Sequence, residues 1–330
     1  MLLTQAHIKE IKTMKIIITG ALGHIGSYLI RRLPDFFPAS EIVMLDNLST
    51  QRYTSLFNLP ATAKYQFIET DVVQNKNLSD LFQGADVVIH LAAITNAAAS
   101  FDNAGEVERV NLNATKNVAN ACVKAKVPMI MASSTSVYGT QKNTVDENCS
   151  AEELKPQSPY ATTKLLEEAF IQEKCVNENL QGVIFRFGTI FGVSPGMRFH
   201  TAVNKFCWQA VMGEPLTVWK TAYHQKRPYL ALEDAARAVE MMIKKNIFDG
   251  KVYNAVSVNA TVSDVVEAIK THKPNVDIDF VENKIMNQLS YEVLNTRMHA
   301  LGFLAQGNLQ QGVSETLALF KVIIARESVA

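Results

Sequence analysis

Cysteines are few in this sequence: there are four in 330 residues, and Cys122, Cys149, Cys175 and Cys207 form no Cys-x-x-Cys pair. This spacing argues against a zinc ribbon, a redox pair of neighbouring thiols and a disulfide framework. The seven histidines contain no His-Glu-x-x-His motif, so no metal site is predicted. We therefore expect reduced thiols in a cytoplasmic protein.

The sequence also lacks net charge and long hydrophobic runs. Its 32 Lys and Arg residues balance 32 Asp and Glu residues, so no overall field attracts nucleic acid or an anionic membrane. The most apolar stretch, residues 87–99, is interrupted by His90, Thr95 and Asn96 and is too short to cross a bilayer. Residues 1–13 carry several charges and are interpreted as an N-terminal extension rather than a signal peptide.

The chain does contain enough apolar residues, 48%, to bury a large core in one large or two fused domains. A β-branched run at residues 15–19 predicts a buried strand. A helix is expected from the following glycines to about Leu33, with its exit marked by Pro34 and Pro38, and then a strand at residues 41–45. This alternation predicts an α/β fold with a doubly wound parallel sheet.

The loop after the first strand contains three regularly spaced glycines, Gly20, Gly23 and Gly26. The first allows a tight turn, the second lets the backbone approach a pyrophosphate, and the third allows close packing of helix on strand. The spacing is G-x-x-G-x-x-G rather than G-x-G-x-x-G. Alone, such a triplet is also compatible with a strand-to-helix connection that binds no ligand.

Asp46 ends the second strand, 20 residues after Gly26, which is the separation expected for a carboxylate that binds an adenosine ribose. Because a carboxylate there repels a 2′-phosphate, NAD is favoured over NADP. Two alternatives stay open: Asp46 is a turn residue, or the nearby Arg52 accommodates NADP.

Three further strands, at residues 65–69, 86–91 and 128–132, deliver their carboxyl ends to the same edge of the sheet. The first ends at Asp71 and Val72, the second at Leu91, Ala92 and Ala93, and the third at a hydroxyl-rich segment, residues 133–139. His90 is predicted to be a strand residue whose ring nitrogens have hydrogen-bond partners within the protein. Asn111 lies among the apolar positions of a long helix at 105–126, where a buried amide is expected to have a hydrogen-bonding duty.

Tyr160 and Lys164 are four residues apart, so at the start of a helix they share one face. An ammonium beside the phenol is expected to lower the tyrosine pKa from about 10 and make it a general acid/base. The alternative is an ordinary amphipathic helix start. Hydroxyls at the end of the strand at 128–132 could align a substrate oxygen facing this tyrosine.

The ordered set of motifs resembles the extended short-chain dehydrogenase/reductases, in particular the NAD-dependent sugar-nucleotide epimerase/dehydratase family. The matching segments are residues 19–26, Asp46, 71–72, 90–93, Asn111, 133–139, 160–164, 186–192 and 227–234. The resemblance implies a Rossmann domain at 14–188 and a smaller mixed α/β substrate lobe at 189–330, with residues of about 227–257 returning to the Rossmann domain. It also implies a homodimer formed by the helices at 105–126 and 160–178.

The resemblance assigns roles to individual residues. Tyr160 is the general base, Lys164 lowers its pKa and binds the nicotinamide ribose, and Ser134 occupies the catalytic Ser/Thr position. The predicted NAD contacts are Gly20, Gly23, His24, Ile25, Gly26, Asp46, Asn47, Asp71, Val72, Leu91, Ala92, Ala93, Asn111, Tyr160 and Lys164. The predicted substrate contacts are Ser134, Thr135, Ser136, Thr189, Arg198, Asn204 and Arg227.

Thr135 and Ser136 separate the possible reactions. Relatives that eliminate water resemble one another in placing Asp and Glu at these two positions, where they act as an additional acid and base. The neutral hydroxyls of Thr135 and Ser136 cannot supply this second proton relay. The expected function is epimerisation of a nucleotide-activated sugar through a transient keto-sugar. The alternatives are a nucleotide-sugar dehydrogenase or reductase and a non-catalytic NAD-binding scaffold.

Two departures from the family pattern leave the substrate open. Thr189 stands where many relatives have asparagine, and residues 284–287 replace a late Arg-x-x-Asp contact to the nucleotide. Arg198 and Arg227 are candidates for a diphosphate clamp, because guanidinium groups bind phosphate oxygens in pairs. A solvated surface role is an equal alternative for Arg198.

Overall fold

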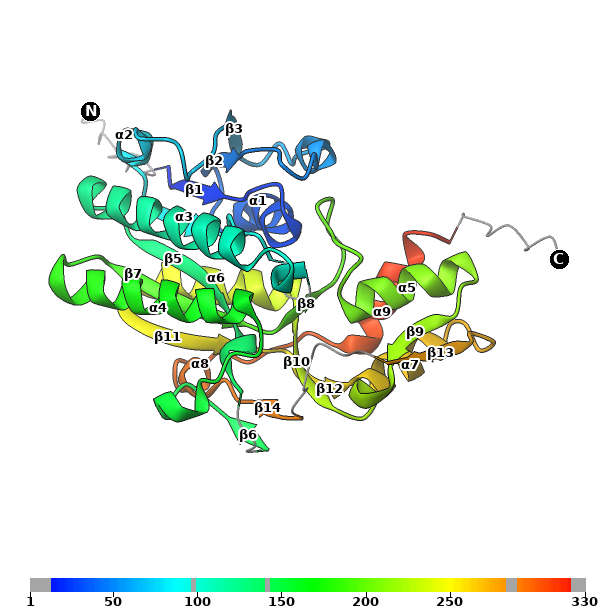
Figure 1. Ribbon diagram of the computed structural model, residues 1–330. Helices are drawn as coiled ribbons and strands as arrows, with labels where there is room; N and C mark the ends of the chain where they lie inside the picture. The colour runs from blue at the N-terminus through cyan, green and yellow to red at the C-terminus, as the bar shows by residue number, and fades with distance from the viewer. Residues whose placement is uncertain (1–12, 96–98, 140–142, 283–289, 322–330) are drawn as a thin grey trace, which may run out of the picture.

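A seven-stranded parallel sheet, in the order β11-β7-β5-β4-β1-β2-β3, organises the protein (Figure 1). The computed structural model describes residues 13–95, 99–139, 143–282 and 290–321. The strands of this sheet are β1 (Lys15–Thr19), β2 (Glu41–Asp46), β3 (Lys64–Glu69), β4 (Val87–His90), β5 (Met129–Ser134), β7 (Gly182–Phe187) and β11 (Asp249–Ala255).

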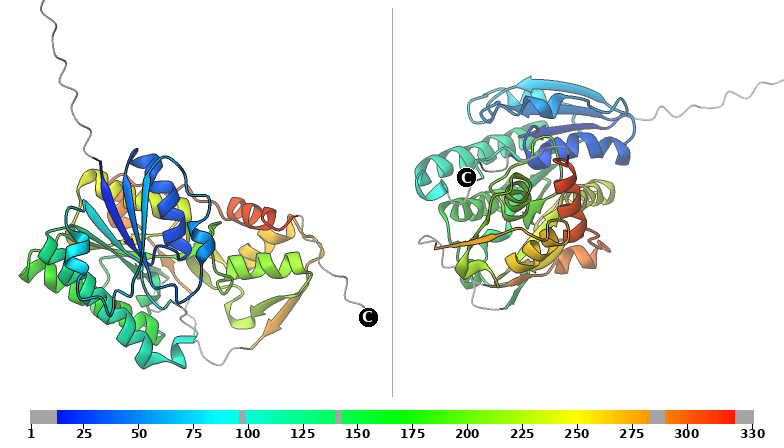
Figure 2. Two further views of the ribbon diagram at one scale, coloured as in Figure 1. Left: turned by 90° about the horizontal axis from the view of Figure 1, so that it is seen from above. Right: turned by 90° about the vertical axis from the view of Figure 1, so that its right-hand side faces the viewer.

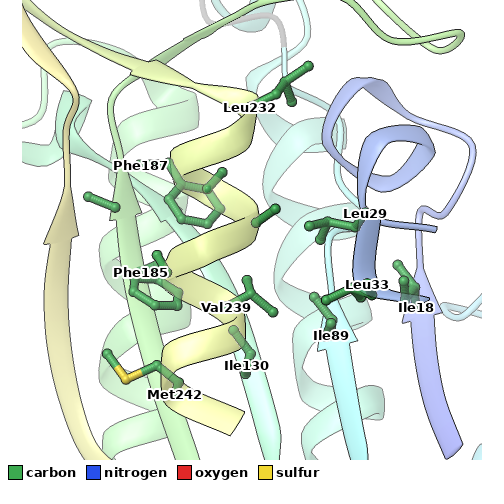
Figure 3. Close-up of a cluster of buried hydrophobic side chains, with 14 of the residues drawn as sticks. Ile18, Leu29, Leu33, Ile89, Ile130, Phe185, Phe187, Leu232, Val239 and Met242 are labelled. Atoms are coloured by element: carbon green, nitrogen blue, oxygen red, sulfur yellow. The ribbon is translucent and has the colours of Figure 1, made fainter. Parts of the chain in front are cut away.

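Helices cover both faces of the sheet because its central strands are apolar on both sides. Ile16 and Ile18 of β1 face α1 (His24–Phe36) and α6 (Leu232–Lys245), whereas Ile17 faces the opposite layer. That layer includes α2 (Leu78–Phe82), α3 (Ala104–Ala125) and α4 (Pro159–Asn177); the last two lie side by side in Figure 1. Figure 3 shows the first layer, which contains Ile18, Leu29, Leu33, Ile89, Ile130, Phe185, Val239 and Met242.

The predicted end of α1 at about Leu33 is wrong, because the helix continues through Pro34 to Phe36 and ends before Pro38. A proline inside a helix leaves the carbonyl four residues earlier without its usual donor. Here the Tyr65 hydroxyl donates a hydrogen bond of 3.0 Å to the Ile30 carbonyl. A contact from β3 therefore replaces the backbone hydrogen bond that Pro34 cannot make.

A smaller lobe lies to one side of the carboxyl edge of the large sheet (Figure 2). Its core joins α5 (Ala202–Met212), α7 (Val262–Lys270) and α9 (Leu309–Ala318). The remaining strands and α-helix of the described residues are β6 (Thr144–Val145), β8 (Thr189–Phe191), β9 (Leu216–Trp219), β10 (Lys226–Ala231), β12 (Val258–Thr261), β13 (Ile278–Val281), β14 (Glu292–Val293) and α8 (Thr296–Ala300).

The chain returns from this lobe to the large sheet, since α6 packs on the α1 side and β11 pairs with β7. The α9 helix of this lobe ends at Ala318. Residues 1–12 of the predicted extension at 1–13 and the departure at 284–287 lie outside the described residues. None of the helices in the described ranges has the length and apolar character needed to cross a bilayer.

Candidate active site

A cavity of about 1030 Å³ lies between the carboxyl edge of the large sheet and the smaller lobe. Most of the predicted site residues line it. They are Gly20, Gly23, His24, Ile25, Gly26, Asp46, Asn47, Asp71, Val72, Leu91, Ala92, Ala93, Ser134, Thr135, Ser136, Tyr160, Lys164, Thr189, Arg198 and Arg227.

The glycine loop forms one wall of the cavity. Gly20 has a φ of +66°, and a Cβ there would lie 2.7 Å from the Ala92 nitrogen. A Cβ on Gly26 would lie 2.5 Å from the Gly20 carbonyl oxygen. The α1 helix then begins at His24 with Gly23 as its N-cap and no side-chain cap. Its first amides can therefore bind an anion.

Two carboxylates shape the outer part of this wall. Asp46 accepts backbone hydrogen bonds of 3.0 Å from Leu22 on Oδ2 and from Leu48 on Oδ1. Asp71 similarly accepts from the Val73 amide at 2.8 Å. A carboxylate oxygen has capacity for more than one hydrogen bond, so Asp46 can also bind ribose hydroxyls.

Ser134 lies at the end of β5 on the inner wall. Its Oγ accepts hydrogen bonds from the Ser136 amide at 3.1 Å and the Ser136 hydroxyl at 2.9 Å. Because these bonds occupy its oxygen, the Ser134 hydroxyl hydrogen is left to donate to a substrate oxygen. Thr135 is buried and donates to the Phe187 carbonyl at 3.3 Å.

Tyr160 and Lys164 lie in the first turns of α4, which Ser158 caps by accepting from the Ala161 amide. The Lys164 Nζ is 5.8 Å from the centre of the Tyr160 ring. It donates a 3.0 Å hydrogen bond to Glu167, and both side chains of this ion pair are buried. Helical spacing thus places the phenol, the ammonium and a carboxylate together.

The expectation that the pKa of Tyr160 lies below its ordinary value is wrong for this structure. Burial raises the pKa of Tyr160, and Lys164, which acts in the opposite direction, does not offset it. Burial also acts to lower the pKa of Lys164, but Glu167 and Tyr160 outweigh it, so the net pKa lies above the ordinary value. The sequence identified the pair but not the burial of its surroundings.

Two arginines line the part of the cavity next to the smaller lobe. Arg198 donates to the Thr95 hydroxyl, whereas its buried Nε has no hydrogen-bond partner among the described residues. Burial lowers the pKa of Arg198, and Tyr160 is close enough to act against this. Arg227 lies over the Tyr291 ring at 5.6 Å and donates to Gln225 Oε1 at 2.9 Å.

Residues 16–255 match the model of the NAD dependent epimerase/dehydratase family. The chain belongs to this family. An uncharacterized UDP-glucose epimerase of Bacillus subtilis is 30% identical over 249 residues, covering 73% of this chain and 76% of that protein. The solved UDP-glucuronic acid 4-epimerase of Bacillus cereus, in complex with UDP-glucuronic acid and NAD, is 26% identical with a TM-score of 0.84 and covers 93% of this chain and 99% of its own.

A longer relative is the trifunctional UDP-glucose 4,6-dehydratase/UDP-4-keto-6-deoxy-D-glucose 3,5-epimerase/UDP-4-keto-L-rhamnose-reductase of Arabidopsis thaliana. It is 30% identical over 319 residues, which cover 93% of this chain. This epimerase/dehydratase family member spans about half, 47%, of that relative's length.

Two predicted contacts of this family member do not line the cavity. The Asn111 side chain is buried and bonds both to the Ile94 amide at 2.7 Å and to the Ile94 carbonyl at 2.9 Å, so it holds the loop after β4. Asn204 is buried behind Arg198 and donates to its carbonyl oxygen at 2.9 Å. Contacts of Asn111 to NAD and of Asn204 to substrate remain predictions.

Other cavity residues of the family member were not selected from the sequence. Tyr291, whose hydroxyl donates to the Thr135 carbonyl at 3.3 Å, and His200 both line the site. No local pattern in the sequence distinguishes these residues. Glu167 is buried beside Lys164 and does not line the cavity, but it lies three residues after this lysine, so helical spacing could have identified the ion pair.

Proposed function

We propose that this family member catalyses NAD-dependent epimerisation of a nucleotide-activated sugar through a transient keto-sugar. The observation that carries the proposal is the convergence of Ser134, Tyr160 and Lys164 on a cavity whose other wall is the glycine loop. A hydroxyl donor, a phenol and an ammonium form a set suited to proton transfer at a sugar hydroxyl.

The residues present fit NAD. The uncapped amino end of α1 and the close-packed glycine loop would hold the pyrophosphate, and Asp46 would hold the adenosine ribose. Asp71 and Val72 would line the adenine site, and Lys164 would bind the nicotinamide ribose. When bound, NAD would supply reversible hydride transfer at the sugar carbon, which allows inversion through the ketone.

The chain's own residues would move the proton. Tyr160, as phenolate, would remove the proton of the sugar hydroxyl and later return it. Ser134 would donate its free hydroxyl hydrogen to the same oxygen and align it. Lys164 would stabilise the phenolate electrostatically.

The charges of the cavity favour epimerisation over elimination of water. Among the described residues that line it, the carboxylates are Asp46, Asp71 and Glu106, all from the cofactor half. No carboxylate of the described lining therefore accompanies Ser134 to act as a second acid or base. Thr135 is already engaged with the Phe187 carbonyl.

The same lining suits an anionic substrate. Three acidic side chains of the lining are outnumbered by six basic ones. The basic ones are Arg52, Arg109, Lys164, Arg198, Lys205 and Arg227. We propose a nucleotide diphosphate sugar, with Arg227 and Arg198 as its anion contacts and Thr189 beside the sugar. Structures of similar proteins, MoeE5 and the Bacillus cereus 4-epimerase, hold UDP-glucuronic acid, which makes UDP-sugars the first to test.

The test is to incubate the purified chain with UDP-, GDP-, CDP- and dTDP-sugars, without and with added NAD or NADP, and to follow products by NMR. Isomers formed without net NADH production support epimerisation. Stoichiometric formation or loss of reduced cofactor would replace the proposal by the dehydrogenase or reductase. Binding of NAD without turnover on any sugar would favour the non-catalytic scaffold.

We also propose a homodimer formed through α3 and α4. These helices lie side by side on one face, and α4 exposes Leu166 at 42% and Val176 at 81%. Light scattering should give twice the 36.6 kDa chain mass, whereas a monomer across micromolar concentrations would contradict this. The cytoplasm is kept as the predicted compartment, since the four cysteines, all within the described residues, are free thiols.

A further inference from the structure

Glu167 lies beside the proposed catalytic pair and has no role in the proposed function. Its side chain is 1% exposed, and its Oε2 is 3.0 Å from the Lys164 ammonium. Its other oxygen, Oε1, is buried without a hydrogen-bond partner among the described residues. A buried carboxylate with one oxygen unsatisfied is costly, so its presence beside Lys164 requires a physical explanation.

A directional chain of hydrogen bonds ends on Glu167. The Thr115 hydroxyl bonds to Oε2 at 2.7 Å, and His90 Nε2 lies 3.1 Å from the Thr115 oxygen. On the other side of the ring, His90 Nδ1 lies 2.7 Å from the Thr19 hydroxyl, whose oxygen accepts from the Ala92 amide.

Burial keeps the His90 ring neutral by lowering its pKa to about 3. Thr115 donates to Glu167, so its oxygen accepts from His90 Nε2, and His90 Nδ1 then accepts from the Thr19 hydroxyl. The Thr19 oxygen in turn accepts from the Ala92 amide. Glu167 accepts from both Thr115 and Lys164, as a carboxylate does.

The carboxylate changes what Lys164 can do for Tyr160. A lone ammonium stabilises a nearby phenolate through its full charge, whereas an ammonium paired with a carboxylate presents a dipole, whose attraction falls off more steeply with distance. The Lys164 Nζ donates a 3.0 Å hydrogen bond to Glu167 Oε2 and lies 5.8 Å from the centre of the Tyr160 ring. The ammonium is therefore paired directly with the carboxylate.

Other charged groups face the same pair. Glu168 acts on Lys164 but is itself paired with Arg186 at 2.7 Å. Arg198 acts on Tyr160 from the loop after β8 and favours the phenolate. Neither Glu168 nor Arg198 is bonded to Lys164, so Glu167 is the carboxylate placed to weaken the ammonium's effect.

We propose that Glu167 is a positioning residue that holds Lys164 charged and partly neutralises it, so that Tyr160 becomes an effective base at higher pH than it would beside an unpaired lysine. The inference rests on the proposed role of Tyr160 as the base. Glu167 also acts through Lys164 rather than on the substrate.

The direct test is a titration of the Tyr160 phenol in the full chain, by ¹³C NMR of protein labelled at the tyrosine Cζ, without and with added NAD. The Tyr160 signal among the nine tyrosines is assigned by its absence in Tyr160→Phe. Glu167→Gln keeps the hydrogen-bonding shape and removes the charge. We expect its Tyr160 titration to move to lower pH, because removing a nearby negative charge makes proton release from the coupled pair easier.

Activity gives a second readout. At a pH on the acid limb of the kcat/KM profile, each protein retains a fraction of its own plateau activity. This fraction should be about threefold or more larger in Glu167→Gln than in the wild type, because the limb moves to lower pH. Glu167→Asp, whose carboxylate is one methylene shorter, should move both readouts in the same direction by less, and it carries the test should Glu167→Gln not fold. Glu173→Gln, an exposed change of the same charge on α4, is the matched control and should leave both unchanged.

An unshifted or upward-shifted Tyr160 titration in Glu167→Gln or Glu167→Asp would overturn the inference and leave Glu167 as a structural anchor. The NMR titration needs no substrate, so it reports on Glu167 even if no sugar is epimerised. Failure of the proposed function and failure of this inference are therefore distinguishable.

Discussion

Glu167 and Glu168 are neighbours on α4, and both are buried, yet they serve opposite purposes. Glu168 accepts from Arg186 Nε and Nη2 and from the Ser133 hydroxyl, so both of its oxygens are satisfied. Arg186 in turn donates to the Tyr138 hydroxyl at 3.0 Å. Glu167 pairs with Lys164 and Thr115, and its other oxygen has no hydrogen-bond partner within the described part of the chain.

The difference separates a scaffold ion pair from one placed at the site of chemistry. A buried pair whose hydrogen bonds are complete fixes the end of β5 against α4 and β7. In the second pair, Lys164 lines the cavity beside Tyr160, whereas Glu167 is buried and does not line it. The lysine can therefore contact a ligand, and the carboxylate can influence the charge state of the tyrosine through the lysine. Changes around Glu168 should therefore reduce stability first, and changes around Lys164 should reduce activity first.

The largest expected effect is the loss of activity when Tyr160, the neighbour of Lys164, is changed. Tyr160→Phe removes the proposed base while keeping the ring, so kcat should fall by about 10³-fold to 10⁴-fold. Binding of NAD, measured by calorimetry, should stay within a few-fold of wild type. Full activity in this variant would show that the catalytic assignment is wrong.

The next effect concerns Glu168. Glu168→Gln leaves the Arg186 charge buried without its anion, so the free energy of unfolding should fall by about 3–5 kcal/mol. Urea denaturation followed by circular dichroism measures this. The exposed Glu173→Gln is the control, and an equal loss in both variants would remove the distinction drawn between the two carboxylates.

Ser134→Ala should have an intermediate effect on activity. Removing the hydroxyl that would align the substrate oxygen should lower kcat by about 10²-fold, as for the loss of one donor to a developing oxyanion. Its thermal stability should stay near that of wild type because Ser134 is only partly buried. A variant that loses stability but keeps kcat would show that Ser134 has a structural role rather than the proposed catalytic one.

The smallest effect is in the pH dependence of stability. Burial and the Lys164 charge lower the pKa of His90 from 6.5 to about 3. The unfolded chain therefore binds this proton near pH 6.5 and the folded chain only near pH 3, so stability is full above pH 6.5 and declines as the pH falls toward 3. His90→Gln should flatten this decline in urea midpoints measured from pH 7 to 4.5, whereas the exposed His299→Gln should not.

The cofactor half of the site could be predicted because its signals are local. Gly20, Gly26 and Asp46 act through backbone conformation and spacing, which a single stretch of sequence contains. Tyr160 and Lys164 were found in the same way, through helical periodicity. The sheet followed from apolar runs buried on both faces, such as Lys15–Thr19.

The remainder depended on contacts between distant segments. The helix runs through Pro34 because the hydroxyl that compensates for this proline, on Tyr65, comes from the distant strand β3, which local sequence does not indicate. The pKa of Tyr160 was predicted in the wrong direction because burial depends on the whole fold. Tyr291 reaches Thr135 across 156 positions of sequence, and nothing near either residue indicates this.

The most direct test of the proposed hydride shuttle is epimerisation in D₂O. A UDP-sugar that the chain converts, UDP-glucuronic acid or UDP-glucose first, is incubated with the protein and NAD, and the product is examined by ¹H NMR. If the same hydride leaves and returns, the inverted carbon keeps its ¹H while the hydroxyl exchanges freely. Deuterium at the inverted carbon would mean inversion by carbon deprotonation and would contradict the proposed mechanism.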